Sequence, residues 1–119
     1  MQKLTNKEEE VMQVLWKLEK AFVKEMLEIF PEPKPHYNTL STMIRILEEK
    51  GFVSYNSYGN SHQYYPLISK EAYSKRYMSA AIASYFDNSY KSMVSMFAKE
   101  EKISASDLRE ILEMIENKK

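Results

Sequence analysis

One segment, from His36 to Leu67, constrains the fold more than any other part of the chain. In its first half, apolar residues recur at the spacing of a helix with one buried side, and this pattern stops at Lys50-Gly51, a typical helix end. Its second half holds two short runs rich in tyrosine, phenylalanine and valine, on either side of the turn pair Gly59-Asn60. The segment therefore predicts an amphipathic helix followed directly by a β-hairpin.

Two shorter helices are expected before this segment. Thr5 and Glu8 have the spacing of a capping box at the start of the first helix, and the second helix runs over residues 23–30. The sequence PEPKP at residues 31–35 must end the second helix, because proline does not fit a helix interior. The order of helix, helix, proline-rich turn, helix and hairpin is typical of a winged helix-turn-helix, whose second motif helix enters the DNA major groove.

The third helix pattern has a polar side opposite its apolar stripe. Small hydroxyl and amide side chains on that side permit close approach to base edges, and an arginine can bind guanine through two hydrogen bonds. The backbone N–H groups at the helix start attract phosphate, and the hairpin is placed to contact the flanking DNA backbone. The candidate DNA-binding residues are His36, Tyr37, Asn38, Thr39, Ser41, Thr42 and Arg45 from the helix and its start, with Asn60 and His62 from the hairpin.

The charge pattern supports a second interpretation. Lysine plus arginine total 17, aspartate plus glutamate also total 17, and no lysine or arginine occurs between Gly51 and Ser69. DNA-binding domains usually carry an excess of basic residues, so this balance weighs against DNA binding, although the local placement of charge matters more than the total. The alternative is a winged-helix module that binds another protein and no DNA.

From Ser69 onward the chain changes character and predicts three further helices. The first of them, up to about Phe86, is apolar on two sides and so needs two packing partners. We expect a mainly α fold with a small β-hairpin: a winged-helix DNA-binding domain over residues 1–68 and a three-helix dimerisation subdomain over residues 69–119. The candidate dimerisation residues are Tyr73, Tyr77, Ile82, Tyr85, Met93, Phe97, Leu108, Ile111, Leu112 and Ile115. An alternative role for part of this set is a hydrophobic ligand pocket, formed by Tyr73, Tyr77, Met93 and Phe97.

Several classes of function find no support in the sequence. The chain has no cysteine, which rules out disulfides, thiolate metal sites and cysteine nucleophiles. Its two histidines, His36 and His62, have no partner at helical ligand spacing, and no nucleophile, phosphate-loop or catalytic carboxylate pattern is present. We therefore expect no metal, no cofactor and no enzymatic activity. No apolar run approaches the about 20 residues of a membrane span, and the charged start lacks a signal-peptide core, so we expect a cytoplasmic protein.

Three stretches of the sequence resemble the penicillinase repressor family of transcriptional regulators: LTNKEEEVMQVLW, YNTLSTMIRILEEKGFV and QYYPLI. The opening helix matches the family pattern at Leu4, Thr5, Glu8, Val11, Met12, Leu15 and Trp16. The third helix matches it at Thr39, Leu40, Thr42, Ile44, Leu47, Lys50 and Gly51, and the hairpin closes with Tyr64, Tyr65 and Pro66. The resemblance covers essentially the whole chain.

The resemblance implies a homodimeric repressor of bacterial transcription, in which each winged helix binds half of a palindromic DNA operator. It also implies a partner, a membrane metalloprotease-receptor pathway that leads to cleavage of the repressor in the dimerisation region. The chain departs from the family pattern at Ile46, where relatives carry arginine, and at Met96-Phe97, where the antibiotic-responsive members are cut between asparagine and phenylalanine. Without cysteine, it also lacks the copper-sensing motif of one branch of the family.

Overall fold

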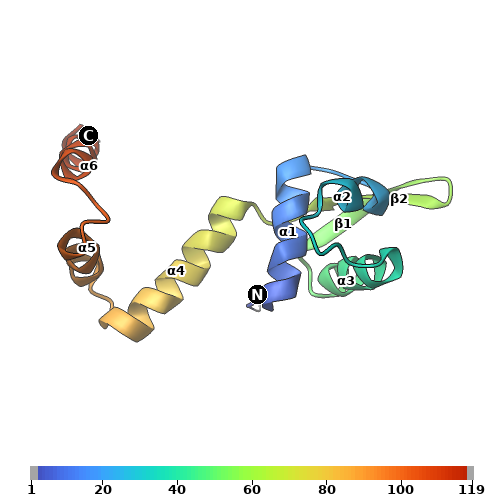
Figure 1. Ribbon diagram of the computed structural model, residues 1–119, viewed down its shortest axis with the longest axis horizontal. Coiled ribbons are helices and arrows are strands. Elements are labelled where there is room, and N and C mark those ends of the chain that lie inside the picture. The colour runs from blue at the N-terminus through green and yellow to red at the C-terminus, as the bar shows by residue number, and fades with distance from the viewer. Residues whose placement is uncertain (1–2, 118–119) are drawn as a thin grey trace. The chain divides into compact units, whose positions relative to one another are not determined.

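The computed structural model describes residues 3–117 and is mainly helical with one β-hairpin (Figure 1), which is the predicted fold class. The elements are α1 (Asn6–Leu18), α2 (Val23–Ile29), α3 (Tyr37–Glu49), β1 (Val53–Tyr58), β2 (Ser61–Pro66), α4 (Lys70–Phe86), α5 (Tyr90–Lys99) and α6 (Ala105–Glu116). Residues 1, 2, 118 and 119, at the ends of the two predicted domains, lie outside the described residues.

The chain divides into two compact units, and the division falls between Lys75 and Arg76. The N-terminal unit holds α1, α2, α3, the hairpin and the start of α4, whereas the C-terminal unit holds the rest of α4 with α5 and α6. The division lies inside α4, seven residues after the Ile68–Ser69 domain boundary that remains a prediction from composition.

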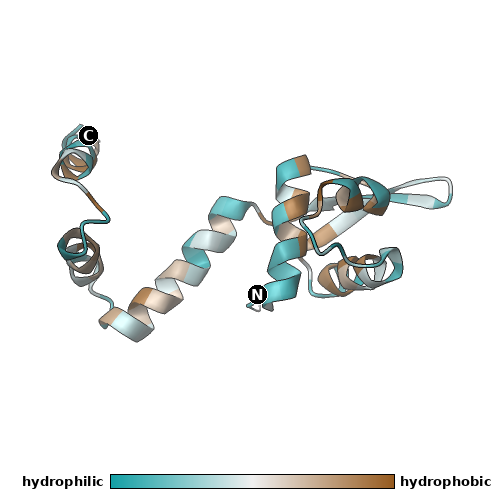
Figure 2. Cartoon of the chain, in the orientation of Figure 1, coloured by the Kyte–Doolittle hydropathy of each residue, from teal (hydrophilic) through white to brown (hydrophobic). Residues whose placement is uncertain are grey.

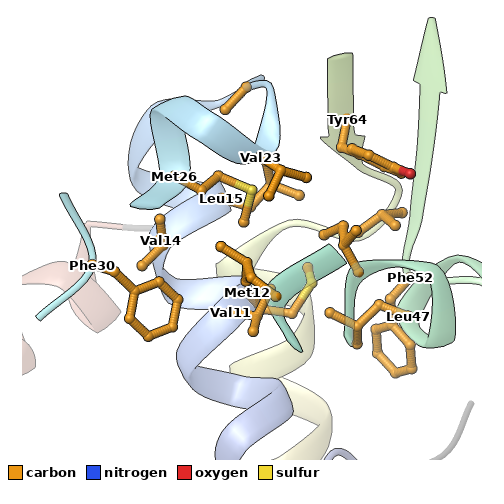
Figure 3. Close-up of a cluster of buried hydrophobic side chains, with 14 of the residues drawn as sticks. Val11, Met12, Val14, Leu15, Val23, Met26, Phe30, Leu47, Phe52 and Tyr64 are labelled. Atoms are coloured by element: carbon orange, nitrogen blue, oxygen red, sulfur yellow. The ribbon is translucent and has the colours of Figure 1, made fainter. Parts of the chain in front are cut away.

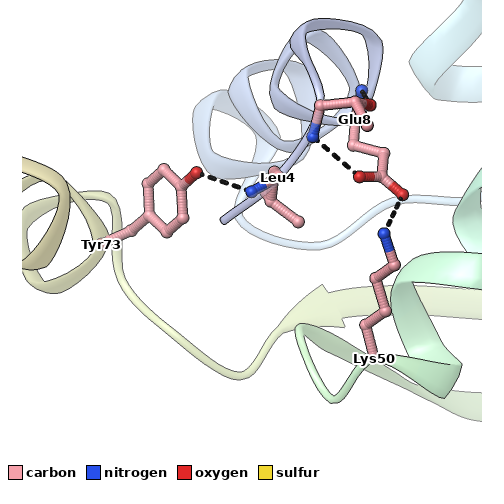
Figure 4. A network of polar contacts seen from close by, with 5 residues as sticks. Leu4, Glu8, Lys50 and Tyr73 are labelled. Atoms are coloured by element: carbon pink, nitrogen blue, oxygen red, sulfur yellow. Dashed lines mark hydrogen bonds and ion pairs between the residues drawn. The ribbon is translucent and has the colours of Figure 1, made fainter. Parts of the chain in front are cut away.

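The start of α1 is joined to the end of α3 through one buried glutamate. Thr5 and Glu8 form the predicted capping box, because the Thr5 hydroxyl accepts from the Glu8 N–H at 3.2 Å and Glu8 Oε1 accepts from the Thr5 N–H at 2.9 Å. Glu8 Oε2 accepts a hydrogen bond from Lys50 Nζ at 2.7 Å (Figure 4). Burial raises the pKa of the Glu8 carboxyl, but the bonds from Lys50 and Thr5 outweigh it, so the pKa lies below its ordinary value of 4.5.

The core of the N-terminal unit forms where one face of each of α1, α2 and α3 meets the start of the hairpin (Figure 3). Its fully buried side chains include Val11, Met12, Leu15, Met26, Leu40, Ile44, Leu47 and Phe52. Each such side chain contributes about 1.5–3 kcal/mol when it is removed from water. Because the apolar stripe of α3 is buried in this core, the opposite side of α3 must face outward.

The hairpin is fixed to the connector between α1 and α2. Strands β1 and β2 pair antiparallel, from Val53 opposite Pro66 to Tyr58 opposite Ser61, around the predicted turn. Ala21 forms an isolated bridge with Tyr64, in which each N–H donates to the other residue's carbonyl, at 2.9 and 2.8 Å. The hairpin is therefore anchored at its base, near the end of β2.

Tyr73, a candidate dimerisation residue in the sequence, packs within the N-terminal unit. Its ring packs against Trp16 and Phe52, with ring centroids 5.8 and 6.0 Å apart. Its hydroxyl accepts from the Leu4 N–H at 3.1 Å (Figure 4). The same hydroxyl donates to Glu9 Oε2 at 2.9 Å. Only 7% of Tyr73 remains exposed, so its ring is part of the core of the N-terminal unit.

The helices of the C-terminal unit are well capped but poorly buried. Ser89 caps α5 by accepting from the Ser92 N–H, and Ser104 forms a capping box with Asp107 at the start of α6. Apolar residues occur along all three helices (Figure 2), yet among described residues 76–117 only Ile82 is buried. No helix within residues 3–117 is long and apolar enough to cross a membrane.

Candidate nucleic-acid interface

The start of α3 offers open backbone N–H groups. His36 occupies the N-cap position in an extended conformation, and no side chain caps the helix there. The first turn of α3 also carries no acidic residue, and His36, Tyr37, Asn38 and Thr39 are all exposed. Unsatisfied N–H groups and the positive end of the helix dipole favour a phosphate at such a position.

The outward side of α3 carries Asn38, Thr42 and Arg45, all exposed, whereas Ser41 is half-buried at its margin. The Thr42 hydroxyl donates to the Asn38 carbonyl at 3.0 Å, and Arg45 Nε donates to the Ser41 carbonyl at 3.2 Å. Each side chain is therefore held along its own helix. These three side chains are polar, lie close to the helix backbone and carry one positive charge, which suits the floor of the DNA major groove. The same helix also exposes Ile46, at 37%, and Glu49.

An open groove of about 960 Å³ runs between the start of α2, the side of α3 and the hairpin. Five of the nine candidate DNA-binding residues line it: Tyr37, Ser41, Arg45, Asn60 and His62. Segments that are distant in sequence, the third helix and the hairpin tip, thus contribute to one continuous surface.

A smaller hollow of about 410 Å³ lies on the α1 side of the α3 start. His36 and Thr39 line it together with two lysines, Lys7 and Lys34, and two glutamates, Glu10 and Glu32. Lys34 Nζ also donates to the Glu28 carbonyl at 3.1 Å, near the end of α2. Asn38 and Thr42 belong to the lining of neither hollow and stand on the exposed side of α3.

Aromatic rings brace the hairpin beside the groove. His62 stacks on Tyr55 with ring centroids 4.0 Å apart and an interplanar angle of 11°. Tyr58 meets Phe22 edge-on, at 5.9 Å, across the groove from α3. Burial, and then the nearby Glu48 carboxylate, raise the pKa of the Tyr64 phenol, so Tyr64 is neutral near pH 7.

The described residues offer no group of three histidine or acidic side chains that could hold a metal ion. The polar groups along the groove are hydroxyls, amides, an imidazole and two cations, Lys24 and Arg45. Glu25 is the acidic member of the lining, and its Oε1 accepts from the Phe22 N–H at 2.8 Å. The hydroxyl, amide and imidazole groups can donate hydrogen bonds, and Lys24 and Arg45 attract anions.

The model of the penicillinase repressor family matches residues 4–117 of this chain of 119 residues. The chain belongs to that family. Penicillinase repressors are DNA-binding transcriptional regulators, not enzymes. A comparison with curated proteins finds no match to the chain.

For a penicillinase repressor, the groove and the smaller hollow add cations that the sequence did not single out. Lys24 stands at the start of α2 within the groove lining, and Lys7 and Lys34 stand at the smaller hollow. In helix-turn-helix proteins the first motif helix crosses the DNA backbone, so a lysine in its first turn is a sequence signal for a phosphate contact. Together with Arg45, Lys24 gives the groove two cations against the one carboxylate of Glu25. At the smaller hollow the two lysines are balanced by Glu10 and Glu32.

The candidate dimerisation residues of this penicillinase repressor fall into three groups. Tyr73 belongs to the N-terminal core and Ile82 is buried within the C-terminal unit. Half-buried members are Met93, Phe97 and Leu108. Exposed members are Tyr77, Tyr85, Ile111, Leu112 and Ile115.

Proposed function

We propose that this penicillinase repressor works as a homodimer that binds a palindromic DNA operator, with α3 of each protomer in the major groove. The observation that carries the proposal is the division of α3 into two sides. Leu40, Ile44 and Leu47 are fully buried, whereas Asn38, Thr42 and Arg45 are exposed. A helix held by its apolar stripe in this way presents its polar side at a fixed angle, as base reading requires.

Cations lie on both sides of α3, and those of the groove outnumber its carboxylates, which supports phosphate contacts on the groove side. Lys24 lies on the groove side, and Lys7 and Lys34 lie on the other. The hairpin carries no lysine or arginine, so its tip offers neutral donors such as Asn60 and His62. We propose that α2, α3 and the loop between them supply most of the electrostatic attraction, and that the hairpin adds weaker neutral contacts.

The exposed apolar side chains of the C-terminal unit support the homodimer. Neither α5 nor α6 has a buried residue, and Tyr85, Leu112 and Ile115 are 80%, 52% and 64% exposed. Capped amphipathic helices without a core need a second surface to cover them. A second copy supplies such a surface and sets the separation of two recognition helices, which a palindromic operator requires.

The proposal extends to release of the operator by proteolysis, with a membrane metalloprotease-receptor as the signalling partner. The bond that the resemblance marks for cleavage, Met96–Phe97, lies within α5. A cut there separates α6 from α4 and divides the surface assigned to the second copy. Mass spectrometry of the chain after co-expression with such a protease tests this point, and an intact chain under those conditions contradicts it.

A salt titration with a selected operator tests DNA binding directly. The full chain selects a duplex from a randomised pool at low salt, and affinity is then measured by fluorescence anisotropy as salt rises. We expect log K to fall linearly with log salt, with a slope of roughly −4 to −7 if most of the cations around α3 reach phosphates. If no duplex is bound at low salt, DNA binding is refuted and the protein-binding module remains.

A further inference from the structure

Thr42 and Arg45, on the outward side of α3, each donate a hydrogen bond to a backbone carbonyl of their own helix. The Thr42 hydroxyl donates to the Asn38 carbonyl at 3.0 Å, and Arg45 Nε donates to the Ser41 carbonyl at 3.2 Å. A threonine hydroxyl has one hydrogen and two lone pairs. With its hydrogen in the bond to Asn38, the exposed oxygen of Thr42 can only accept.

Arg45 has the opposite character. Its Nε–H is engaged, but the two terminal nitrogens keep their N–H groups, and a guanidinium never accepts. Thr42 and Arg45 are three residues apart, so they are neighbours on one side of the helix. The outward side of α3 therefore presents an acceptor-only group next to a donor-only group.

The base edges in the major groove also differ in whether they offer a hydrogen-bond donor. Adenine and cytosine each present an amino group there, N6 or N4, whereas guanine and thymine present oxygen or nitrogen acceptors without an amino donor. An acceptor-only hydroxyl pairs with an amino group, and it faces guanine O6 or thymine O4 with no hydrogen to share. The direction of the bond from Thr42 to Asn38 thus selects between two classes of base.

We propose that Thr42 is a specificity-determining residue that accepts a hydrogen bond from an exocyclic amino group, adenine N6 or cytosine N4, in each operator half-site. The inference rests on the proposed function, because it needs α3 in the major groove. It goes further by assigning the chemical class of base that one side chain recognises. The competing role for Thr42 is contact of its methyl group with the thymine methyl group, which needs no acceptor.

A double-mutant cycle on the full chain and its selected operator tests the assignment. In the DNA, each adenine of the half-site is replaced in turn by purine and each cytosine by 2-pyrimidinone, which removes the amino group, and each thymine is replaced by uracil, which removes the methyl group. In the protein, Thr42→Val keeps the shape and removes the acceptor, and Thr42→Ser keeps the hydroxyl and removes the methyl group. The cycle cancels the weaker base pairing that the altered bases cause in the duplex.

At one position of the half-site, we expect loss of the amino group to weaken binding by the wild-type chain more than binding by Thr42→Val. The fold-loss in affinity should be roughly 5 to 20 times larger for the wild type. Thr42→Ser should retain most of that penalty, because a serine hydroxyl can bond to the same Asn38 carbonyl. Thermal unfolding serves as the folding control, since Thr42 is exposed and both variants should unfold near the wild-type temperature.

Two results overturn the inference while operator binding stands. One is an amino-group penalty that is the same for wild type and Thr42→Val at every position. The other is a coupling of Thr42 to the thymine methyl group, seen as a uracil penalty that disappears in Thr42→Ser. Failure of the full chain to bind any duplex at low salt overturns the proposed function as well, so the two failures are distinguishable.

Discussion

The hydroxyl of Tyr73 accepts a hydrogen bond from the backbone N–H of Leu4, 3.1 Å away and 69 residues earlier in the chain. The same hydroxyl donates to Glu9, and the ring is packed between Trp16 and Phe52. A further bond, from Trp16 Nε1 to the Ile68 carbonyl at 2.8 Å, fixes the segment just before α4. The start of α4 is therefore an integral part of the N-terminal unit.

Tyr73→Phe should destabilise the N-terminal unit by about 1–2 kcal/mol, because the buried Leu4 N–H loses its acceptor while the ring packing stays. Urea unfolding followed by Trp16 fluorescence measures the change. Tyr85→Phe, on the same helix at an 80% exposed position, is the matched control and should change stability by less than about 0.5 kcal/mol. Equal effects of the two variants would contradict the role given to Tyr73.

A chain ending at residue 75 should fold more stably than one ending at residue 68. The shorter chain lacks the Tyr73 side chain, and loss of a buried aromatic side chain costs about 3–5 kcal/mol. Thermal unfolding of the two purified fragments compares them. Tyr73→Ala in the 75-residue fragment should reproduce the behaviour of the shorter one, and fragments of equal stability would place the boundary before α4 after all.

Stability should fall with pH as Glu8 becomes protonated. The folded pKa of Glu8 lies below 4.5, so the ion pair with Lys50 stabilises the fold fully above that value and is lost as pH falls through the folded pKa. Glu8→Gln should cost about 1–2 kcal/mol at pH 7, because glutamine can keep the capping bond but not the charge.

Urea unfolding at a series of pH values measures that difference between Glu8→Gln and wild type. We expect it to shrink toward zero as pH falls through the lowered pKa of folded Glu8, below which both side chains are neutral. Glu113→Gln, a change at an exposed position of α6, controls for net charge. The free energy of unfolding of this variant should equal that of wild type at every pH. A Glu8→Gln penalty that persists unchanged in acid would contradict the ion-pair explanation.

Leu112→Lys and Ile115→Lys should shift the proposed dimer toward monomer, because each places a charge on the exposed apolar side of α6. We expect the dissociation constant of the dimer to rise at least tenfold, which corresponds to about 1.4 kcal/mol. Sedimentation velocity over a concentration series measures it. Glu110→Lys introduces the same group at an exposed polar position of the same helix and should leave the dimer intact.

Lys24→Gln should weaken operator binding about equally for all sequences and reduce the salt slope by about 1–2 for a dimer, because a phosphate contact carries no base information. Anisotropy titrations with the selected operator and with an unrelated duplex measure both quantities. Lys17→Gln removes the same charge from a residue that lines a different hollow, with Trp16 and Ile29, and should leave the slope unchanged. An identical slope for Lys24→Gln and wild type would remove Lys24 from the interface.

Local patterns in the sequence predicted most of the secondary structure. The capping box at Thr5, the helix end at Gly51 and the hairpin turn at Gly59-Asn60 are each set by residues a few positions apart, and all three occur in the structure. The position of Tyr73 could not be predicted in this way, because its partner Leu4 is 69 residues away in the sequence. Helical spacing predicts only which side of the helix is apolar.

The candidate interface shows the same limit. Periodicity predicted which side of α3 faces outward, since that follows from where Leu40, Ile44 and Leu47 are buried. The positions of Lys24 and Lys34 around α3 depend on how three helices pack, and no periodic pattern records it. The direction of the Thr42 bond depends on a side-chain rotamer, which a sequence does not specify.

The Met96–Phe97 bond lies within α5, and this limits the rate of any proteolytic cut there. The two carbonyls beside the bond accept from the backbone N–H groups of Glu100 and Lys102, at 3.1 and 2.9 Å. A protease binds its substrate as an extended strand, so both bonds must break and the last turns of α5 must unwind first. The fraying rate of this one helix then sets the ceiling on how quickly the chain can be switched off, however abundant the protease is.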